Sequence, residues 1–400
     1  MATLGKRISR LTPSATMNMT DMAERMRANN AEIIGLVGGE PDYDTADNVK
    51  EAGIAAIRAN ITRYPPTNGR EDLRRALSQK LRRDNNLDYP PDQIVVSSGT
   101  KPLIHAALMA LADLGDEVIV PAPHWVSYPE TVRLAGLEPV FVVCPASTGF
   151  RLRAEDLAAA ITPRTRAVIL NSPNNPTGAV YSDEDLRALV EVLLLHPQLW
   201  ILTDEIYEDI CYLDKRPTSI AALDPRIAER VITINGFSKG YAMAGWRLGY
   251  AAGPKAAMNA MLTVLGHVMG PCTSISQVAG AEAVSGERSY LEANCRAYQE
   301  RRDITVAAVN EMPGLSCQTP DGAFFLWGDC AGVIGRRTPG GKIIQSDQDF
   351  VAGVMEHAGV VMLAGAPFGM SPYFRMSYSI ETTILRRALD RVGAFCRSLA

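Results

Sequence analysis

Two ionisable residues, Asp204 and Lys239, stand where burial would alter their chemistry. Asp204 follows an apolar run, and a carboxylate buried there needs a partner because an unpaired buried charge is expensive. Lys239 lies in a segment with little other charge, and desolvation lowers the pKa of a lysine from roughly 10.4, which makes it a usable nucleophile. The alternatives are a structural ion pair or helix cap at Asp204 and a solvated loop lysine at position 239.

Both residues belong to short polar segments that each follow a predicted strand. The segments are residues 98–101 (SGTK), 171–178 (NSPNNPTG), 204–207 (DEIY) and 235–240 (NGFSKG). In open α/β sheets, ligands bind at the carboxyl ends of the strands. The sequence therefore predicts that these four segments form a single site.

The first segment, Ser98-Gly99-Thr100, opens a predicted helix and is a candidate phosphate site, because a helix N-terminus presents free N–H groups. An ordinary capping turn is an equally good interpretation. The sequence contains no GxGxxG run, and residues 335–342 lack the spacing of a P-loop. The pattern argues against a dinucleotide or a nucleoside triphosphate.

Two further motifs are typical of serine hydrolases. Residues 236–240 match GxSxG, and residues 98–101 match SxxK, but the accompanying KTG motif is absent. A GxSxG nucleophile elbow requires a strand, a turn and a helix, whereas residues 241–253 are glycine-rich and end in a strand-like run. A hydrolase that uses Ser238 therefore stays a minor alternative.

The elements that must position these segments alternate between short apolar runs and longer amphipathic ones. The predicted strands are residues 93–97, 117–120, 167–170, 199–203 and 231–234, and the helical stretches include residues 102–112, 152–160 and 182–195. Ser182 is the expected N-cap of the last helix, with acidic residues in its first turn. This alternation predicts an α/β fold with a mostly parallel sheet and helices on both faces.

The pattern changes near residue 285. A long predicted helix over residues 287–311 is followed by strands 323–327, 360–363 and 374–378 and a terminal helix over 381–398. A chain of 400 residues also favours two domains. We predict a large domain over residues 46–285 and a smaller, discontinuous α+β domain formed by residues 1–45 and 286–400.

Composition narrows the class of protein. Hydrophobic residues make up 47% of the chain and its net charge is −4, which is typical of a globular protein without a nucleic-acid or membrane partner. The seven cysteines are scattered and the five histidines are isolated, so neither a disulfide framework nor a metal site is expected. Without an apolar run of roughly 18 residues or a signal-like N-terminus, the expected location is the cytoplasm.

The segments SPNNPTG, DEIYED and NGFSKGYAMAGWRLGY, in this order, resemble those of class I/II aminotransferases. These are pyridoxal 5′-phosphate (PLP) enzymes of fold type I, with a large sheet-containing domain and a smaller α+β domain. Residues 13–16, 38–42, 64–66, 123–125 and 372–378 are similar to the bacterial aspartate aminotransferase subgroup. The resemblance covers nearly the whole chain.

The resemblance implies a catalytic role for three residues. Lys239 would hold PLP covalently and later move a proton, Asp204 would pair with the ring nitrogen, and Tyr207 would bind the ring's phenolic oxygen. Asn175 would bind the same oxygen, and Trp125 would stack on the ring.

Further residues would bind the cofactor's phosphate. Gly99, Thr100 and Arg247 would hold it within one subunit. Tyr64 would reach the phosphate of a neighbouring subunit, which implies a homodimer with shared active sites.

The substrate contacts follow from the same resemblance. Arg375, in an alternating strand, would bind the α-carboxylate with its two-pronged guanidinium, and Gly39 and Asn175 would approach the substrate, as would the ring-stacking Trp125. Lys101, one of only eight lysines, and Thr16 would bind a second carboxylate. A solvated Lys101 is the alternative.

Three positions depart from the family pattern. Gly236 stands where other branches use a phosphate-binding serine, and His124 where relatives often have tyrosine. Thr12 replaces a lysine associated with prephenate use in some relatives, which argues against that second activity.

The resulting hypothesis is a ping-pong aminotransferase that converts L-aspartate and 2-oxoglutarate to oxaloacetate and L-glutamate. Alternatives with the same cofactor are an alanine, aromatic or branched-chain aminotransferase and a C–S lyase. A serine hydrolase and a catalytically inactive regulator with this fold are alternatives of other classes.

Overall fold

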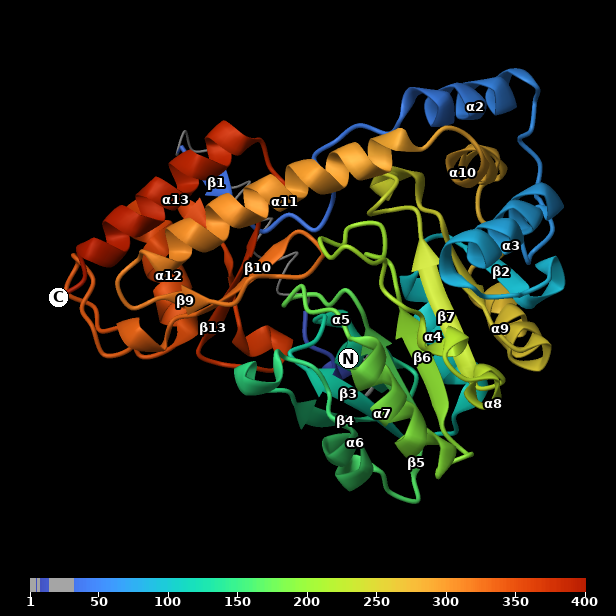
Figure 1. Ribbon diagram of the computed structural model, residues 1–400, viewed down its shortest axis with the longest axis horizontal. Helices are drawn as coiled ribbons and strands as arrows, with labels where there is room; N and C mark the ends of the chain where they lie inside the picture. Colours follow the sequence, from blue (N-terminus) through green and yellow to red (C-terminus); the bar gives the residue numbers. More distant parts are fainter. Residues whose placement is uncertain (1–4, 6–7, 14–31) are drawn as a thin grey trace, which may run out of the picture.

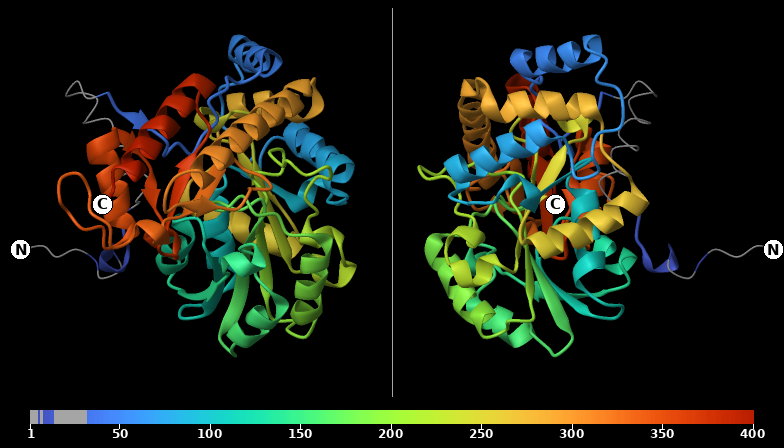
Figure 2. Two further views of the ribbon diagram at one scale, coloured as in Figure 1. Left: turned by 60° about the vertical axis from the view of Figure 1, so that its left-hand side comes forward. Right: turned by 90° about the vertical axis from the view of Figure 1, so that its right-hand side faces the viewer.

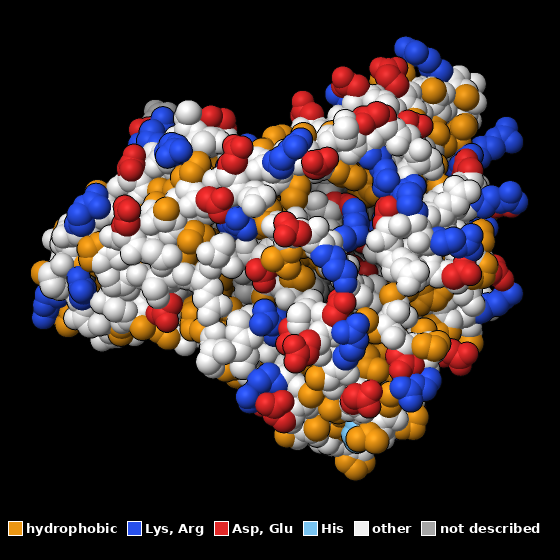
Figure 3. Space-filling model, in the orientation of Figure 1, with side chains coloured by type: hydrophobic (Ala, Val, Ile, Leu, Met, Phe, Trp, Pro, Cys, Tyr) orange, Lys and Arg blue, Asp and Glu red, His pale blue; other side chains and the backbone are white. Residues whose placement is uncertain are grey.

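The computed structural model of this chain describes residue 5, residues 8–13 and residues 32–400. A seven-stranded sheet lies beside a four-stranded one, and the long helix α11 (Ser289–Asn310) runs between the two parts (Figure 1). The predicted α/β fold is confirmed. On the face shown in Figure 3, basic and acidic side chains are interspersed, in keeping with forty basic and forty-four acidic residues.

The seven-stranded sheet has the order β2-β8-β7-β6-β5-β3-β4. Its strands are β2 (Ile94–Ser97), β3 (Glu117–Ala122), β4 (Glu138–Val143), β5 (Thr165–Asn171), β6 (Trp200–Asp204), β7 (Val231–Gly236) and β8 (Gly249–Ala252). Only β8 runs antiparallel to its neighbours, β2 and β7. The carboxyl ends of the five predicted strands therefore meet at one edge of the sheet.

The central strands are buried on both faces, which explains why they appear in the sequence as continuous apolar runs. Alternate residues of β5 enter two different cores: Val168 and Leu170 pack on one face, and Ala167 and Ile169 on the other. Helices cover both faces (Figure 2). On the first lie α3 (Glu71–Asn85), α6 (Ala154–Ala160), α7 (Asp183–Leu194) and α10 (Ser274–Ser285), and on the second α4 (Lys101–Leu111), α5 (Ser127–Leu134) and α9 (Lys255–Val268). Helices α2 (Asp47–Arg58) and α8 (Pro225–Ala228) complete this part.

The four-stranded sheet is antiparallel, with the order β12-β13-β10-β9. Its strands are β9 (Ser316–Cys317), β10 (Phe325–Asp329), β12 (Leu363–Ala364) and β13 (Tyr373–Ser377), and α12 (Asp347–Ala358) and α13 (Thr382–Arg397) pack beside it with α11. The predicted strand over 360–363 is in fact two short strands in different sheets. The first of them, β11 (Val360–Val361), pairs in parallel with β1 (Ile34–Gly35), so two segments far apart in the sequence meet here.

The described residues near the N-terminus contact the larger sheet. Arg10 forms an ion pair with Glu138 of β4 at 2.6 Å, and the amide of Thr12 donates to Glu130 of α5 at 2.9 Å. Among the residues that the structure describes, no helix is long and apolar enough to cross a membrane.

Ser182 is the N-cap of helix α7, as the sequence predicts, and the structure shows in addition a capping box with Asp185. The hydroxyl of Ser182 accepts a hydrogen bond from the amide of Asp185, and the Asp185 carboxylate accepts one from the amide of Ser182, each at 3.0 Å. These bonds satisfy two backbone donors that the helix itself leaves unpaired.

Replacing this cap should lower the stability of the protein measurably. We expect Ser182→Ala to reduce the free energy of unfolding by about 1 kcal/mol, because one amide loses its acceptor. Urea denaturation followed by circular dichroism measures the change. Glu191→Ala, an exposed substitution in the middle of the same helix, is the control and should stay within about 0.5 kcal/mol of the parent.

Candidate active site

A cleft of about 520 Å³ opens at the carboxyl edge of the seven-stranded sheet. The four polar segments predicted from the sequence converge there, together with the segment that follows β3. The lining residues include Gly38, Gly39, Glu40, Thr100, Lys101, Trp125, Tyr128, Asn171, Asn175, Asp204, Tyr207, Ser238, Lys239, Arg247 and Arg375. The expectation of a single site is therefore correct.

Strand register places Asp204 at the back of this cleft. Asp204 ends β6 and lies opposite Asn171 of β5. The Asn171 side chain donates to the carbonyl of Asp204 at 2.8 Å and accepts from the amide of Asn175, also at 2.8 Å. Asn171 thus connects the strand end to the loop that carries Asn175, a positioning role that the sequence analysis did not identify.

The Asp204 carboxylate is buried and hydrogen-bonded. Burial raises its pKa to about 6, while hydrogen bonds from Tyr128 and the amide of Ile206 and the charge of Lys239 lower it. The Tyr128 hydroxyl donates to Oδ2 at 2.8 Å. Sequence reasoning missed Tyr128, because it lies on α5 and not at a strand end. The sequence indicated only that a carboxylate buried at position 204 needs a hydrogen-bond donor.

Lys239 has no carboxylate within ion-pair distance among the described residues, and its ammonium group donates to the carbonyl of Gly39. Burial lowers the pKa of Lys239 to about 8, and the charge of Arg375 adds to this effect, whereas Asp204 and Glu40 oppose it. Near neutral pH, part of the amine is therefore unprotonated and able to react.

The other end of the cleft is suited to an anion. Helix α4 begins at Lys101, and its N-cap residue Thr100 makes no side-chain cap bond. Gly99 has a φ of +90°, and a Cβ there would lie 2.6 Å from Nη2 of Arg247, so the guanidinium is close to the backbone of this turn. Free amides, a helix N-terminus and an arginine together favour a phosphate.

Lys101 lies beside Trp125, with its ammonium nitrogen 4.9 Å from the centre of the indole ring. Burial and the nearby charge of Arg247 lower the pKa of Lys101. Both side chains face the cleft.

Arg375 is 2% exposed and has only neutral partners. Its guanidinium donates to Asn175 Oδ1 at 2.9 Å and to the carbonyl of Val37 at 3.0 Å. No carboxylate lies within ion-pair distance, and its Nε has no hydrogen-bond partner in the described part of the chain. Burial lowers the pKa of Arg375 to about 10. A buried cation of this kind is suited to a carboxylate ligand.

Among the described residues, the predicted site residues Tyr64 and Gly99 do not line this cleft. Thr16 lies outside the described residues. The side chain of Tyr64 is 92% exposed and does not line the cleft of its own chain.

The hydrolase alternative lacks the element it requires. Ser238 lines the cleft, but the chain after Gly240 forms a 3-10 helix over Ala244–Trp246 and then enters β8. A nucleophile elbow needs a helix directly after the serine turn.

The charges of the cleft fit PLP, the cofactor that the resemblance implies. The cleft contains the carboxylate of Asp204, the amine of Lys239, and an anion-binding group formed by Arg247 with the start of α4. PLP has a basic ring nitrogen, an aldehyde and a phosphate. Each of these groups has a partner of the complementary chemistry in this cleft.

Comparison with known proteins gives consistent matches. The sequence matches the aminotransferase class I and II family over residues 31–392. An aspartate/prephenate aminotransferase from Cereibacter sphaeroides is 45% identical over 401 residues, covering 100% of both sequences. The crystal structure of an aspartate aminotransferase from Rhizobium meliloti has a TM-score of 0.97 at 44% identity, with 100% of each chain covered. The aspartate aminotransferase from Thermus thermophilus with maleate has a TM-score of 0.92 at 36% identity, covering 99% of this chain and 100% of that one.

Removing the Tyr128 hydroxyl should make Asp204 harder to ionise. The bond stabilises the charged carboxylate, so we expect Tyr128→Phe to raise the pKa of Asp204 from about 6 by about one unit. Titration of aspartate carboxyl carbons by ¹³C NMR in cofactor-free protein measures this, with Asp204→Asn assigning the signal.

Tyr250→Phe is the matched control, because the hydroxyl of this buried tyrosine has no hydrogen-bond partner among the described residues. It should leave the Asp204 titration unchanged. Equal pKa values for Asp204 in Tyr128→Phe and the parent protein would contradict the assigned role of Tyr128.

Proposed function

The chain belongs to the class I and II aminotransferases, PLP-dependent enzymes, and we propose that it transfers the amino group of L-aspartate to 2-oxoglutarate, giving oxaloacetate and L-glutamate. The observation that carries the proposal is the buried guanidinium of Arg375, which lines the same cleft as Lys239 and has no carboxylate partner in the described chain. An α-carboxylate bound there brings a substrate to the reactive amine.

Different residues of the cleft are proposed to bind different parts of the cofactor. When bound, PLP draws electrons from the α-carbon of the substrate. Lys239 would hold it covalently, and the ionised Asp204 would keep a proton on the ring nitrogen. Tyr207 and Asn175 would bind the ring oxygen, and Trp125 would stack on the ring.

The phosphate belongs at the other end of the cleft. There Gly99 forms the tight turn before α4, Thr100 offers its backbone amide, and Arg247 would supply the compensating charge. Because Gly236 has no hydroxyl, these groups carry the phosphate without the serine that other branches use.

Lys239 also moves the proton of the reaction. With the substrate bound, its free amine would accept the proton from the substrate's α-carbon and then give it up again. A pKa of about 8 suits both directions of this transfer, because the group gains and loses a proton readily near neutral pH. The second half of the ping-pong cycle repeats these steps in reverse.

The choice of a dicarboxylic substrate rests on a second cation. Lys101 lines the cleft and forms no ion pair with a carboxylate of the described chain. Its ammonium group is therefore available for the distal carboxylate of a substrate. Thr16 is proposed to assist from the N-terminal segment. The names of the similar proteins and the maleate, a dicarboxylate, in the Thermus thermophilus structure support this assignment.

The proposed assembly is a homodimer in the cytoplasm. An exposed Tyr64 that does not line its own cleft supports a contact with the neighbouring subunit's phosphate. The seven cysteines are all free thiols, which favours a reducing compartment. Within each subunit we propose a large domain over residues 46–285 and a small domain from residues 1–45 and 286–400, although residues 8–13 contact β4 and α5.

The proposed function predicts different effects on activity for substitutions of Lys239 and of its neighbour Ser238. We expect Lys239→Ala to lower kcat by at least about a thousandfold, because the covalent anchor and the proton carrier are both lost. Ser238→Ala should keep most of the activity. The activity of both variants is measured with aspartate and 2-oxoglutarate as substrates, by monitoring the formation of oxaloacetate. An inactive Ser238→Ala beside an active Lys239→Ala would restore the hydrolase alternative.

Lys101 should determine selectivity between substrates. Lys101→Ser is expected to raise the KM for aspartate by about 10- to 100-fold, because a charged contact to the distal carboxylate is lost, and to change the KM for alanine little. Half-reaction rates over a panel of amino acids provide the measurement.

Lys255→Ser serves as the control, because this exposed lysine pairs with Asp92 at the other end of the sheet and should affect neither substrate. Equal effects of Lys101→Ser on aspartate and alanine would show that Lys101 does not bind the distal carboxylate.

A further inference from the structure

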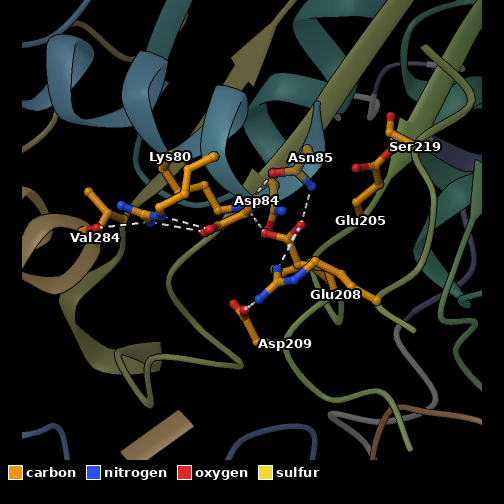
Figure 4. A network of polar contacts seen from close by, with 12 residues as sticks. Lys80, Asp84, Asn85, Glu205, Glu208, Asp209, Ser219 and Val284 are labelled. Atoms are coloured by element: carbon orange, nitrogen blue, oxygen red, sulfur yellow. Dashed lines mark hydrogen bonds and ion pairs between the residues drawn. The ribbon is translucent and has the colours of Figure 1, made fainter. Parts of the chain in front are cut away.

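A buried cluster of charged side chains surrounds Glu208, which directly follows Tyr207 in the chain (Figure 4). It contains Lys80 and Asn85 of α3, Glu208 and Asp209 directly after Tyr207, and Arg216. The side chains of Lys80 and Glu208 are 1% and 3% exposed. None of the five residues lines the cleft.

Both oxygens of the Glu208 carboxylate are bound within this cluster. Lys80 donates to Glu208 Oε1 and, at 2.8 Å, to Asn85 Oδ1. The Asn85 side chain donates to Glu208 Oε2 at 2.5 Å, and Arg216 Nη1 lies 3.3 Å from the same oxygen. As Figure 4 shows, Lys80 and Asn85 converge on Glu208 from one helix.

Arg216 also connects Glu208 to the next residue. Its Nη2 donates to Asp209 Oδ1 at 2.7 Å. Burial alone would raise the pKa of Glu208, but the charges of Lys80 and Arg216 hold it below its usual value, so the carboxylate stays ionised. Burial and the charge of Glu208 raise the pKa of Asp209, whereas Arg216 and Lys80 oppose this effect.

Such a cluster is a poor source of stability, because the cost of desolvating the ions offsets most of their attraction. Its other effect is geometric: a hydrogen-bonded buried ion has few alternative positions.

The cluster holds two turns of the active site. In the turn that carries Tyr207, the amide of Glu208 donates to the carbonyl of Glu205 at 3.0 Å and the amide of Ile210 donates to that of Tyr207 at 2.8 Å. Asp209 packs against Gly240, where a Cβ would lie 2.6 Å from the Asp209 Cβ. Gly240 directly follows Lys239. The anchored residues thus adjoin both reactive side chains.

We propose that Lys80 and Arg216 are positioning residues for the transamination reaction. By binding Glu208 and Asp209 they fix the turn over residues 204–210, and through it the Tyr207 hydroxyl and the Lys239 amine. This role rests on the proposed function. It differs from a purely structural role, which would affect folding and leave the cofactor's environment unchanged.

The test compares Lys80→Met with Tyr207→Phe in PLP-loaded protein. The pH at which the absorbance of the bound cofactor changes reports the environment that Tyr207 creates. We expect Lys80→Met to shift this pH in the same direction as Tyr207→Phe and by a smaller amount. The kcat for aspartate should fall about tenfold or more, since small misplacement of reacting groups is costly, while KM changes less.

Glu117→Gln is the control for the loss of a buried carboxylate that forms an ion pair. Glu117 begins β3, at the opposite end of the sheet, and pairs with Arg164. This variant should lower Tm but leave the absorbance transition and kcat at the parent values.

A second readout needs no cofactor. Hydrogen exchange in the cofactor-free protein, read by mass spectrometry, should be faster over residues 204–210 in Lys80→Met than in the parent and unchanged there in Glu117→Gln. If Lys80→Met does not fold, Lys80→Met/Glu208→Gln removes both charges, avoids an unpaired buried ion, and should show the same two changes.

The outcomes separate the two proposals. A lower Tm with parent values for both the absorbance transition and exchange over residues 204–210 would overturn the positioning role. Should the parent protein neither bind PLP nor transaminate aspartate, the proposed function fails, and the exchange measurement still decides whether Lys80 anchors the turn.

Discussion

The hydrogen bond between Tyr128 and Asp204 connects the fold to the chemistry, because a carboxylate buried at the end of β6 is tolerable only with a donor at hand. Strand pairing fixes one side of Asp204 and helix α5 supplies the other. The remaining bonds around it, from Asn171 to the backbone and on to Asn175, extend the same arrangement to the substrate side of the cleft. Moving α5 relative to β6 would therefore disturb the cofactor and substrate regions together.

Cationic side chains have different hydrogen-bond and ion-pair partners inside and outside the cleft. Behind the active-site turn, Lys80 and Arg216 are paired with carboxylates. Within the cleft, the described chain offers Arg375 and Lys239 only neutral acceptors, namely an amide oxygen and backbone carbonyls. The protein thus keeps cations without counterions where anionic ligands are to bind, and burial sharpens their effect because the local dielectric is low.

The sequence predicted what depends on local pattern. Buried strands read as apolar runs, so their carboxyl ends and the polar segments after them could be located, and Ser182 was recognisable as a cap. Strand β4 was missed because it is a partly exposed edge strand whose pattern is broken by a proline. Tyr128 and Lys80 were missed for a different reason: each sits on a helix and meets its carboxylate only through tertiary packing, at separations of 76 and 128 residues. The roles assigned to Trp125 and Arg247 came from family resemblance, since nothing local distinguishes them.

The pairing of β1 with β11 bears on how the protein is made. During synthesis, Ile34 emerges more than three hundred residues before its partner Val360. At ribosomal speeds of about 5–20 residues per second, the delay is on the order of tens of seconds. The large sheet, whose strands lie between these two points, is complete well before then. Gly39, whose carbonyl accepts a hydrogen bond from Lys239, follows β1 closely, so the nascent chain completes this part of the site only after Val360 has left the ribosome.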